Sequence, residues 1–183
     1  KARCERGLPV SIMRPGNMSG NSSTGLQNVN DFVYLFLNGC LSLGMSPSSD
    51  CDYYFDLTPV DFAAKVVVNA SVKNPSSVIG RTIHLQNPQR PIKLNYVNNS
   101  LNEIGHSISS VTKSEFLTAL HFKCDEERKN GLRTSILLQL ESGFNAFEKY
   151  FLASKWLHYD TTIMEITTSN DLNIECPSIS KDL

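Results

Sequence analysis

The stretch from Gly7 to Gly25, GLPVSIMRPGNMSGNSSTG, has the residue types of a loop that binds a polar cofactor. The apolar residues from Val10 to Met13 predict a short buried strand. It ends at Arg14, Pro15 and Gly16, because Pro15 lacks a backbone N–H and Gly16 tolerates a positive φ. In open α/β sheets, ligands lie in the crevice beyond the carboxyl ends of the strands. An ordinary turn after a strand has a similar composition, so the local pattern leaves both interpretations open.

Other residues that suggest catalysis do not have the required spacing. Tyr150 and Lys155 are five residues apart, whereas a proton-relay pair on one helix face needs a step of four. His84 lies in an expected strand with no carboxylate nearby in the sequence, which favours a structural role. The chain also has no GxGxxG, GxxxxGK, HExxH or GxSxG motif. None of these patterns therefore identifies a catalytic residue.

Composition excludes several classes of protein. The 183 residues are 40% hydrophobic and 19% charged, which is enough for one domain with a real core. A net charge of -1 argues against a nucleic-acid surface, and no apolar run is long enough to span a bilayer. The cysteines are odd in number and lack CxxC spacing, which predicts reduced thiols, no metal site and a cytoplasmic location. They are Cys4, Cys40, Cys51, Cys124 and Cys176.

The expected elements alternate between strand and helix, which favours an α/β fold. Strands are predicted near Val10–Met13, Tyr53–Phe55 and Arg81–Leu85, where β-branched and aromatic residues gather. Later segments have helical spacing of apolar residues, with aromatic side chains concentrated toward the end. These predicted helices cover residues 92–105, 113–122 and 131–157.

Two earlier helices have recognisable start signals. Asp31 is expected to cap a helix whose apolar positions begin with Phe32 and Leu35. In the segment DLTPVDFAAKVVVNAS, Thr58 has the pattern of an N-cap, with Pro59 at the first helical position and Asp61 three residues after the cap. The sequence therefore predicts a capping box at the second helix.

Three segments resemble the second half of the thioester reductase domains that end polyketide synthases, nonribosomal peptide synthetases and carboxylic acid reductases. They are GLPVSIMRPGNMSGNSSTG, NVNDFVYLFLNGCLSLGMSP and DYYFDLTPVDFAAKVVVNAS, and the similarity continues through TIHLQNP and NYVNNSLNEIGHSISSVTKSEFLTAL. The resemblance covers roughly two-thirds of the chain, up to about Lys129. These domains belong to the extended short-chain dehydrogenase/reductase superfamily.

The resemblance implies the C-terminal part of a Rossmann-like fold, followed by a mostly helical substrate subdomain. Residues 1–90 would complete the NADP-binding domain with interleaved substrate segments, and residues 91–183 would form the subdomain that faces substrate and carrier. The residues expected at the nicotinamide end of the cofactor are Arg14, Pro15, Gly16, Asn17, Met18 and Ser19. Those expected near the substrate are Asn28, Asp31, Phe32 and Leu35. Asp56, Thr58 and Asp61 are expected either to brace the subdomain junction or only to cap their helix.

The chemistry that the resemblance implies is the reduction of a carrier-bound thioester. NADPH would reduce an acyl or peptidyl thioester on the phosphopantetheine arm of a carrier protein, releasing an aldehyde or, in some members, an alcohol. The catalytic Thr, Tyr and Lys and the glycine-rich loop would lie before residue 1. We therefore expect a reductase as the parent protein, and an inactive fragment when the chain is alone.

Two other functions remain open from the sequence. A nucleotide-sugar epimerase or related extended short-chain enzyme would share the Arg-Pro-Gly turn, but it usually has basic residues for a diphosphate, for which Arg81 and Arg90 are weak candidates. A noncatalytic scaffold module is the other alternative. Upstream GxxGxxG and YxxxK motifs would identify an enzyme.

Overall fold

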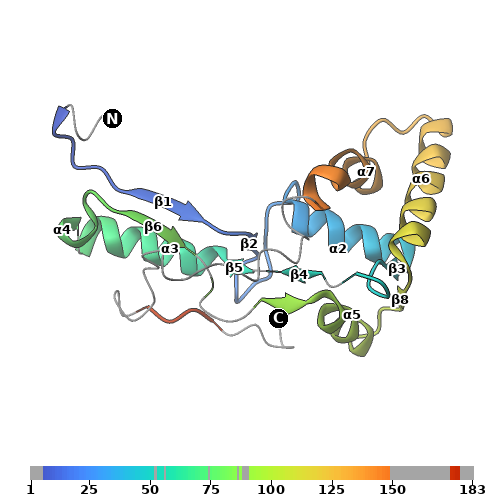
Figure 1. Ribbon diagram of the computed structural model, residues 1–183, viewed down its shortest axis with the longest axis horizontal. Coiled ribbons are helices and arrows are strands. Elements are labelled where there is room, and N and C mark those ends of the chain that lie inside the picture. The colour runs from blue at the N-terminus through green and yellow to red at the C-terminus, as the bar shows by residue number, and fades with distance from the viewer. Residues whose placement is uncertain are drawn as a thin grey trace. The chain divides into compact units, whose positions relative to one another are not determined.

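Two compact units make up the described part of the chain (Figure 1). The computed structural model describes residues 6–51, 53–55, 57–73, 75–85, 87, 91–148 and 174–177. Unit 1 contains the described residues of 1–27, 56–90 and 158–183, and unit 2 contains those of 28–55 and 91–157. Each unit is therefore assembled from segments that are separate in the sequence.

Unit 1 is built on short parallel strand pairs. Strand β1 (Ile12–Pro15) pairs with β6 (Thr82–Leu85), with Ile12 opposite Thr82. Strand β2 (Met18–Ser19) pairs with β5 (Thr58–Pro59) in the same sense. Parallel neighbours need long crossover connections, as in α/β folds. The predicted strand near Arg81–Leu85 is confirmed, and the one expected from Val10 begins two residues later.

Strand β1 is more exposed than the buried strand that the apolar pattern predicts. The exposed fractions of Leu8, Val10 and Ile12 are 46%, 38% and 50%. Among the described residues, β1 pairs with β6 alone, and the N–H groups of Ile12 and Gly16 both donate toward that side. The other edge of β1 is thus unpaired within the part of the chain that the structure describes.

One helix packs on this strand pair and forms the core of unit 1. Helix α3 (Val60–Val68) continues into a π-helical turn, η1 (Asn69–Lys73), and is followed by the short α4 (Pro75–Val78). Figure 1 shows α3 lying along β1 and β6. The buried apolar cluster joins helix and strand side chains, because the helix presents one apolar stripe to the sheet. Its members are Phe62, Ala63, Val66, Ala70, Val78, Ile83 and Leu85.

The start of α3 differs from the predicted capping box. Its N-cap is Pro59, and no side chain caps the helix. Thr58 instead lies in β5, fully buried, and its Oγ1 accepts the backbone N–H of Asn87 at 2.9 Å. The local pattern was misleading because a partner 29 residues away takes the hydroxyl.

Unit 2 begins with helix α2 (Phe32–Leu43), whose predicted cap is confirmed. The Asp31 side chain accepts the N–H of Val33 at 2.9 Å. The helix ends at Gly44, whose φ of 64° is the left-handed conformation that glycine tolerates. The buried face of α2 includes Leu35 and Phe36.

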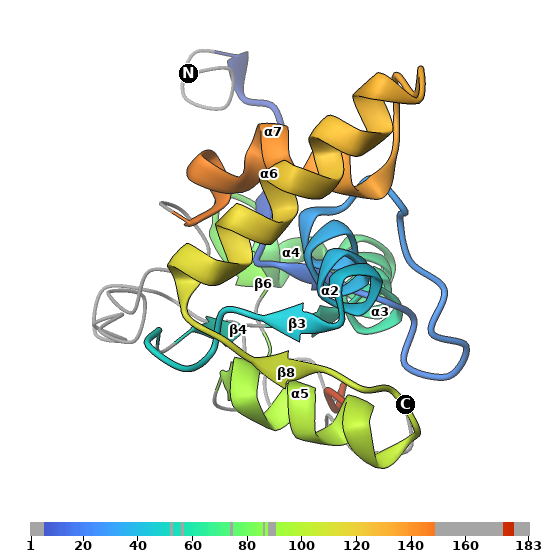
Figure 2. The same ribbon diagram turned by 90° about the vertical axis from the view of Figure 1, so that its right-hand side faces the viewer.

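Aromatic side chains join three helices of unit 2. Helix α6 (Lys113–Lys129) starts with a Thr112–Glu115 capping box, and α7 (Ile136–Phe147) packs against both α2 and α6 (Figure 2). The Phe36 ring lies 6.2 Å from that of Phe116 and 6.5 Å from that of Phe144, measured between centroids. Such spacing is normal for interacting aromatic pairs in a core.

Short strands and one more helix complete unit 2. Strand β3 (Met45–Ser46) pairs in parallel with β8 (Ser109–Ser110), and β4 (Tyr54–Phe55) pairs antiparallel to β7 (Ile92–Lys93). Helix α5 (Leu94–Glu103) follows β7. The predicted strand near Tyr53–Phe55 and the predicted helix within residues 92–105 are both confirmed.

The predicted aromatic helix at 131–157 is confirmed as far as α7 extends. Tyr150 and Lys155 lie outside the described residues, as do Asp56 and Arg90. Among the helices that the structure describes, none has the length and apolar character needed to cross a membrane.

Candidate cofactor-binding strand end

The expected cofactor residues form one continuous segment at the end of β1 and through β2. Arg14 and Pro15 end β1, Gly16 and Asn17 connect the strands, and Met18 and Ser19 make up β2. The connection is hydrogen-bonded on both sides. The Gly16 N–H donates to the Leu85 carbonyl at 2.8 Å, and the Asn17 carbonyl accepts the Thr58 N–H, also at 2.8 Å. Backbone hydrogen bonds therefore join the segment to β6 on one side and to β5 on the other.

Some polar groups of this segment remain available for a ligand. The side chains of Asn17 and Ser19 are half-buried and make no hydrogen bond within the described residues. Gly16 adds no side chain between them and the strand. An amide and a hydroxyl beside bare backbone suit the carboxamide and ribose of a nicotinamide, so these residues fit that class of cofactor.

The conformation of Gly16 differs from the one expected for a turn glycine. Six described glycines have a positive φ, and Gly16 is not among them. Its backbone continues the pairing with β6 instead. Glycine at this position is thus not required by backbone strain.

The loop after β2 closes on itself and is bound to α3. The Asn21 side-chain oxygen accepts the N–H groups of Ser23 and Thr24, at 2.9 and 3.1 Å. Asp61 accepts the Ser22 N–H and hydroxyl, each at 2.8 Å. Burial raises the pKa of Asp61, but the hydrogen bonds that it accepts, first those from Ser22, and the nearby Lys65 charge lower the pKa overall. Sequence reasoning considered Asp61 only as a cap or brace and missed this contact.

The start of β5 is hydrogen-bonded to Asn87, which follows β6. Asn87 is buried, its side-chain NH₂ donates to the Leu57 carbonyl at 2.8 Å, and its N–H donates to the Thr58 hydroxyl. These contacts fix β5 and therefore β2, which pairs with it. His84 lies in β6 opposite Arg14, as a strand residue.

The expected substrate residues lie in unit 2, at the start of α2. Asn28 forms an Asx turn by accepting the Asn30 N–H at 3.0 Å, and Asp31 is the N-cap. Phe32 is half-buried with its ring 6.3 Å from that of Phe36, and Leu35 is buried. The structure thus gives each of them a role in forming or packing α2, and contact with substrate remains a prediction.

A cluster of ionisable side chains in unit 2 was not found from the sequence. The Tyr53 hydroxyl donates to Glu148 at 3.0 Å, and Lys113 pairs with the same carboxylate. Burial raises the pKa of Tyr53, and the neighbouring Cys51 and Glu148 raise it further. Tyr53 is therefore a protonated, hydrogen-bond-donating phenol that ties β4 to the end of α7. Its partner is 95 residues away, and no local pattern indicates such a contact.

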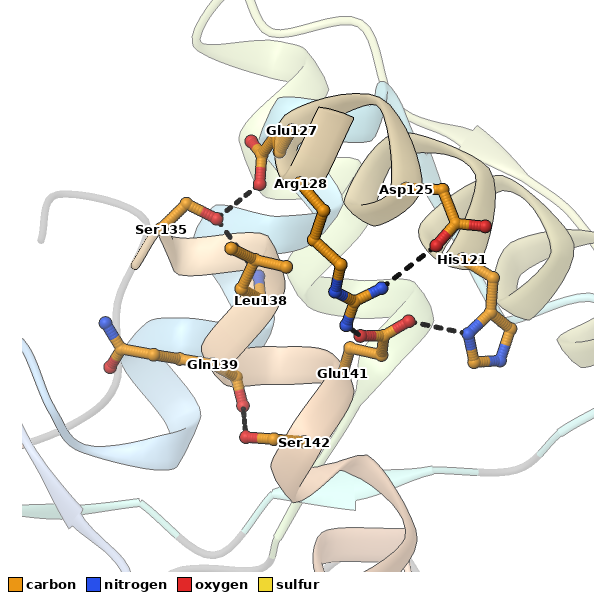
Figure 3. A network of polar contacts seen from close by, with 9 residues as sticks. All are labelled: His121, Asp125, Glu127, Arg128, Ser135, Leu138, Gln139, Glu141 and Ser142. Atoms are coloured by element: carbon orange, nitrogen blue, oxygen red, sulfur yellow. Dashed lines mark hydrogen bonds and ion pairs between the residues drawn. The ribbon is translucent and has the colours of Figure 1, made fainter. Parts of the chain in front are cut away.

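A second polar network joins α6 to α7 (Figure 3). Glu141 accepts His121 Nδ1 at 2.8 Å and pairs with Arg128, which also binds Asp125 at 3.0 Å. The Glu141 side chain is 13% exposed, whereas those of His121 and Arg128 are at least half exposed. Within the described residues, no group of three or more His, Cys, Asp or Glu side chains could hold a metal ion.

Parallel strands with polar residues at their carboxyl ends and a helix packed on one face are features that dinucleotide-binding domains share with other open α/β sheets. An NAD-binding family model described as "Male sterility protein" matches residues 1–67. The large subunit of L-2-aminoadipate reductase from Eremothecium gossypii is 34% identical over 123 residues, which is 67% of this chain and 9% of that protein.

Solved structures agree with this class. The terminal R domain from the myxalamid PKS-NRPS biosynthetic pathway superposes with a TM-score of 0.68 and 28% identity, over 97% of this chain and 42% of that one. A thiolation-reductase di-domain from an archaeal non-ribosomal peptide synthetase has the same fold, with a TM-score of 0.63 and 19% identity over 97% of this chain and 34% of that one. The chain thus spans less than half of these structures and about a tenth of the aminoadipate reductase subunit.

The chain is thus similar to reductase domains of the extended short-chain dehydrogenase/reductase superfamily, and its residues 1–67 match the NAD-binding family. The class of cofactor that this family binds is a nicotinamide dinucleotide.

Proposed function

We propose that the whole protein carrying this chain is an NADPH-dependent thioester reductase. It would act on an acyl or peptidyl thioester held on the phosphopantetheine arm of a carrier protein and release an aldehyde or alcohol in the cytoplasm. The observation that carries the proposal is the strand end at Arg14–Ser19, in a chain that is 28% identical over nearly its whole length to a terminal R domain. The thiolation-reductase di-domain supports a carrier protein as partner.

The residues at the strand end would hold the nicotinamide. The reduced nicotinamide supplies a hydride when it is bound. Asn17 and Ser19 would orient its carboxamide and ribose through side-chain hydrogen bonds, and Gly16 would allow close contact. Pairing of the segment with β6 and β5 fixes these groups before binding, which lowers the entropic cost of ordering them.

The residues at the start of α2 would line the substrate side. Phe32 would offer apolar surface for an acyl chain, and Asn28 and Asp31 would offer polar groups for the arm. Leu35 is buried and would act through the packing of α2. In this division, residues 1–90 mainly serve the cofactor and residues 91–183 the substrate. The segment 28–55 clusters with the later residues and would be one of the interleaved substrate segments.

NADPH oxidation by the whole protein, with an acyl-pantetheine thioester as substrate, tests this proposal. NADPH consumption with matching release of aldehyde or alcohol would support it, and the same assay with NADH would show the cofactor preference. NADPH binding without turnover of any thioester, but with conversion of a nucleotide sugar, would favour the epimerase alternative. A protein that neither binds NADPH nor consumes it would be a scaffold module.

A further inference from the structure

The contact between Ser22 and Asp61 lies directly beyond the short β2–β5 pair. Ser19 of β2 is paired with Pro59 of β5. Ser22 comes three residues after Ser19, and its partner Asp61 comes two residues after Pro59. The chain after β2 is therefore bound to the chain after β5 a second time. A strand pair of two residues on each side is weak by itself, because few hydrogen bonds offset the lost chain entropy.

The loop that Ser22 belongs to is stiff by its own contacts. The Asn21 N–H donates to the Leu26 carbonyl at 2.9 Å, and the Gly25 N–H donates to the Asn21 carbonyl at 2.8 Å. A Cβ on Gly20 would lie 2.6 Å from the Gly25 carbonyl oxygen, so the two ends of the loop nearly touch. If one residue of such a stiff loop is fixed to α3, the loop holds the end of the preceding strand, β2, in a fixed position as well.

Asp61 is well placed to fix the loop to α3 in this way. Its carboxylate uses one oxygen for the Ser22 N–H and the other for the Ser22 hydroxyl, which fixes both distance and orientation. Its side chain is 15% exposed, so water competes little for these bonds. Lys65 lies 3.5 Å from the second oxygen, and its side chain is 65% exposed.

We propose that Asp61 is a positioning residue for the cofactor, acting through Ser22. It holds the loop 20–27, and with it β2, in the arrangement that presents Met18 and Ser19 to the nicotinamide. This inference rests on the proposed function, since it assigns the nicotinamide to the segment Arg14–Ser19. In this proposal neither Asp61 nor Ser22 touches the cofactor. Their contact increases the fraction of molecules in which the strand end has the arrangement that binds NADPH.

The test uses the whole protein and two measurements on the same variants. The rate of hydrogen exchange at the Ser22 amide, without cofactor, measures how firmly Asp61 binds Ser22. The NADPH dissociation constant measures whether that contact affects cofactor binding. For Asp61→Ala we expect exchange at Ser22 to accelerate at least tenfold and the dissociation constant to rise about tenfold, the usual effect of losing charge-assisted hydrogen bonds. Ser22→Ala loses one of the two hydrogen bonds, so its exchange rate and its NADPH dissociation constant should lie between those of Asp61→Ala and the wild type. Ser22→Thr keeps the hydroxyl and should restore wild-type values.

Lys65→Met is the matched control, because it removes the ion pair with Asp61 but leaves both Ser22 contacts. It should change neither measurement. If Asp61→Ala does not fold, the Ser22→Ala and Ser22→Thr pair answers the same question. If the exchange rate at position 22 is unchanged in Asp61→Ala and Ser22→Ala, Asp61 does not hold the loop. Faster exchange with an unchanged NADPH dissociation constant would overturn the positioning role while leaving the proposed function intact. A wild-type protein that binds no NADPH would overturn both.

Discussion

Gly16 provides a direct test of the strand end as a cofactor site. We expect Gly16→Val in the whole protein to weaken NADPH binding about tenfold or more, because the branched side chain would block the approach of the cofactor to the backbone. Gly16 does not have a positive φ, so backbone strain is not the cause of the loss. Titration of NADPH fluorescence measures the affinity, with the melting temperature as a control for folding. Unchanged affinity would remove Gly16 from the site.

Single residues were predictable from the sequence where their partners are local. Asp31 caps α2 as expected, because an N-cap binds a backbone N–H two residues ahead. Thr58 has an equally good local pattern, yet its hydroxyl accepts the N–H of Asn87. Asp61 binds Ser22, which is 39 residues away. Side chains with distant partners cannot be assigned from spacing along one element.

The packing of α2 on α7 depends on two helical glycines that differ in their surroundings. A Cβ on Gly39 would overlap the Leu140 side chain, whereas one on Gly143 would lie 3.7 Å from the Phe32 ring, an ordinary contact. We expect Gly39→Ala to lower the free energy of unfolding by about 1–3 kcal/mol through overpacking. Gly143→Ala should be neutral or stabilising by up to about 1 kcal/mol, because alanine favours the helix. Urea denaturation of both variants measures this, and equal effects would contradict the helix contact described.

The network between α6 and α7 predicts a pH-dependent stability. Burial raises the pKa of Glu141, but its bonds with Arg128 and His121 lower it overall. A carboxylate whose pKa is depressed in the folded state stabilises the protein above its unfolded pKa of about 4.3, and this contribution is lost as the pH falls through the lower folded value. We therefore expect Glu141→Gln to reduce the free energy of unfolding by about 1 kcal/mol at pH 7 and by less near pH 3.

Glu126→Gln is the matched control for this effect. Glu126 lies on the same helix as His121 and Arg128 and pairs with Lys123, but both side chains are about half exposed. Exposed ion pairs of this kind contribute little to stability. The free energy of unfolding of Glu126→Gln should therefore stay within about 0.5 kcal/mol of the wild-type value at any pH. A Glu141→Gln effect that did not decrease toward low pH would rule out the ionised carboxylate as its source.

The alternation of elements was enough to predict an α/β fold, and the predicted strands and helices occur in the expected order. The short strands β2, β3, β5 and β7 were not predicted. The grouping of elements into units was harder to predict. The segment 28–55 clusters with residues after 90, and the contacts responsible join Phe36 to Phe116 and Phe144. Such contacts depend on tertiary packing, which the period of apolar residues does not specify.

The exposed edge of β1 predicts how these 183 residues behave when they are produced alone. Leu8, Val10 and Ile12 expose apolar surface, and β1 has an unpaired edge within the described residues. Unpaired edges and apolar strands promote association. We expect the isolated chain to bind a hydrophobic dye, to aggregate on concentration and to show no measurable NADPH binding, whereas the whole protein binds it. Light scattering and NADPH titration check this, and tight binding by the isolated chain would contradict it.

The interleaving of the two units also affects how the protein is made on the ribosome. Phe36 leaves the ribosome roughly a hundred residues before Phe144, the aromatic side chain that it packs against in α7. At about 5–20 residues per second, α2 would wait roughly 5–20 seconds for that partner. During that time its apolar face is exposed in the cell, so synthesis itself creates a period in which chaperone binding to Phe32–Leu43 would protect the nascent chain.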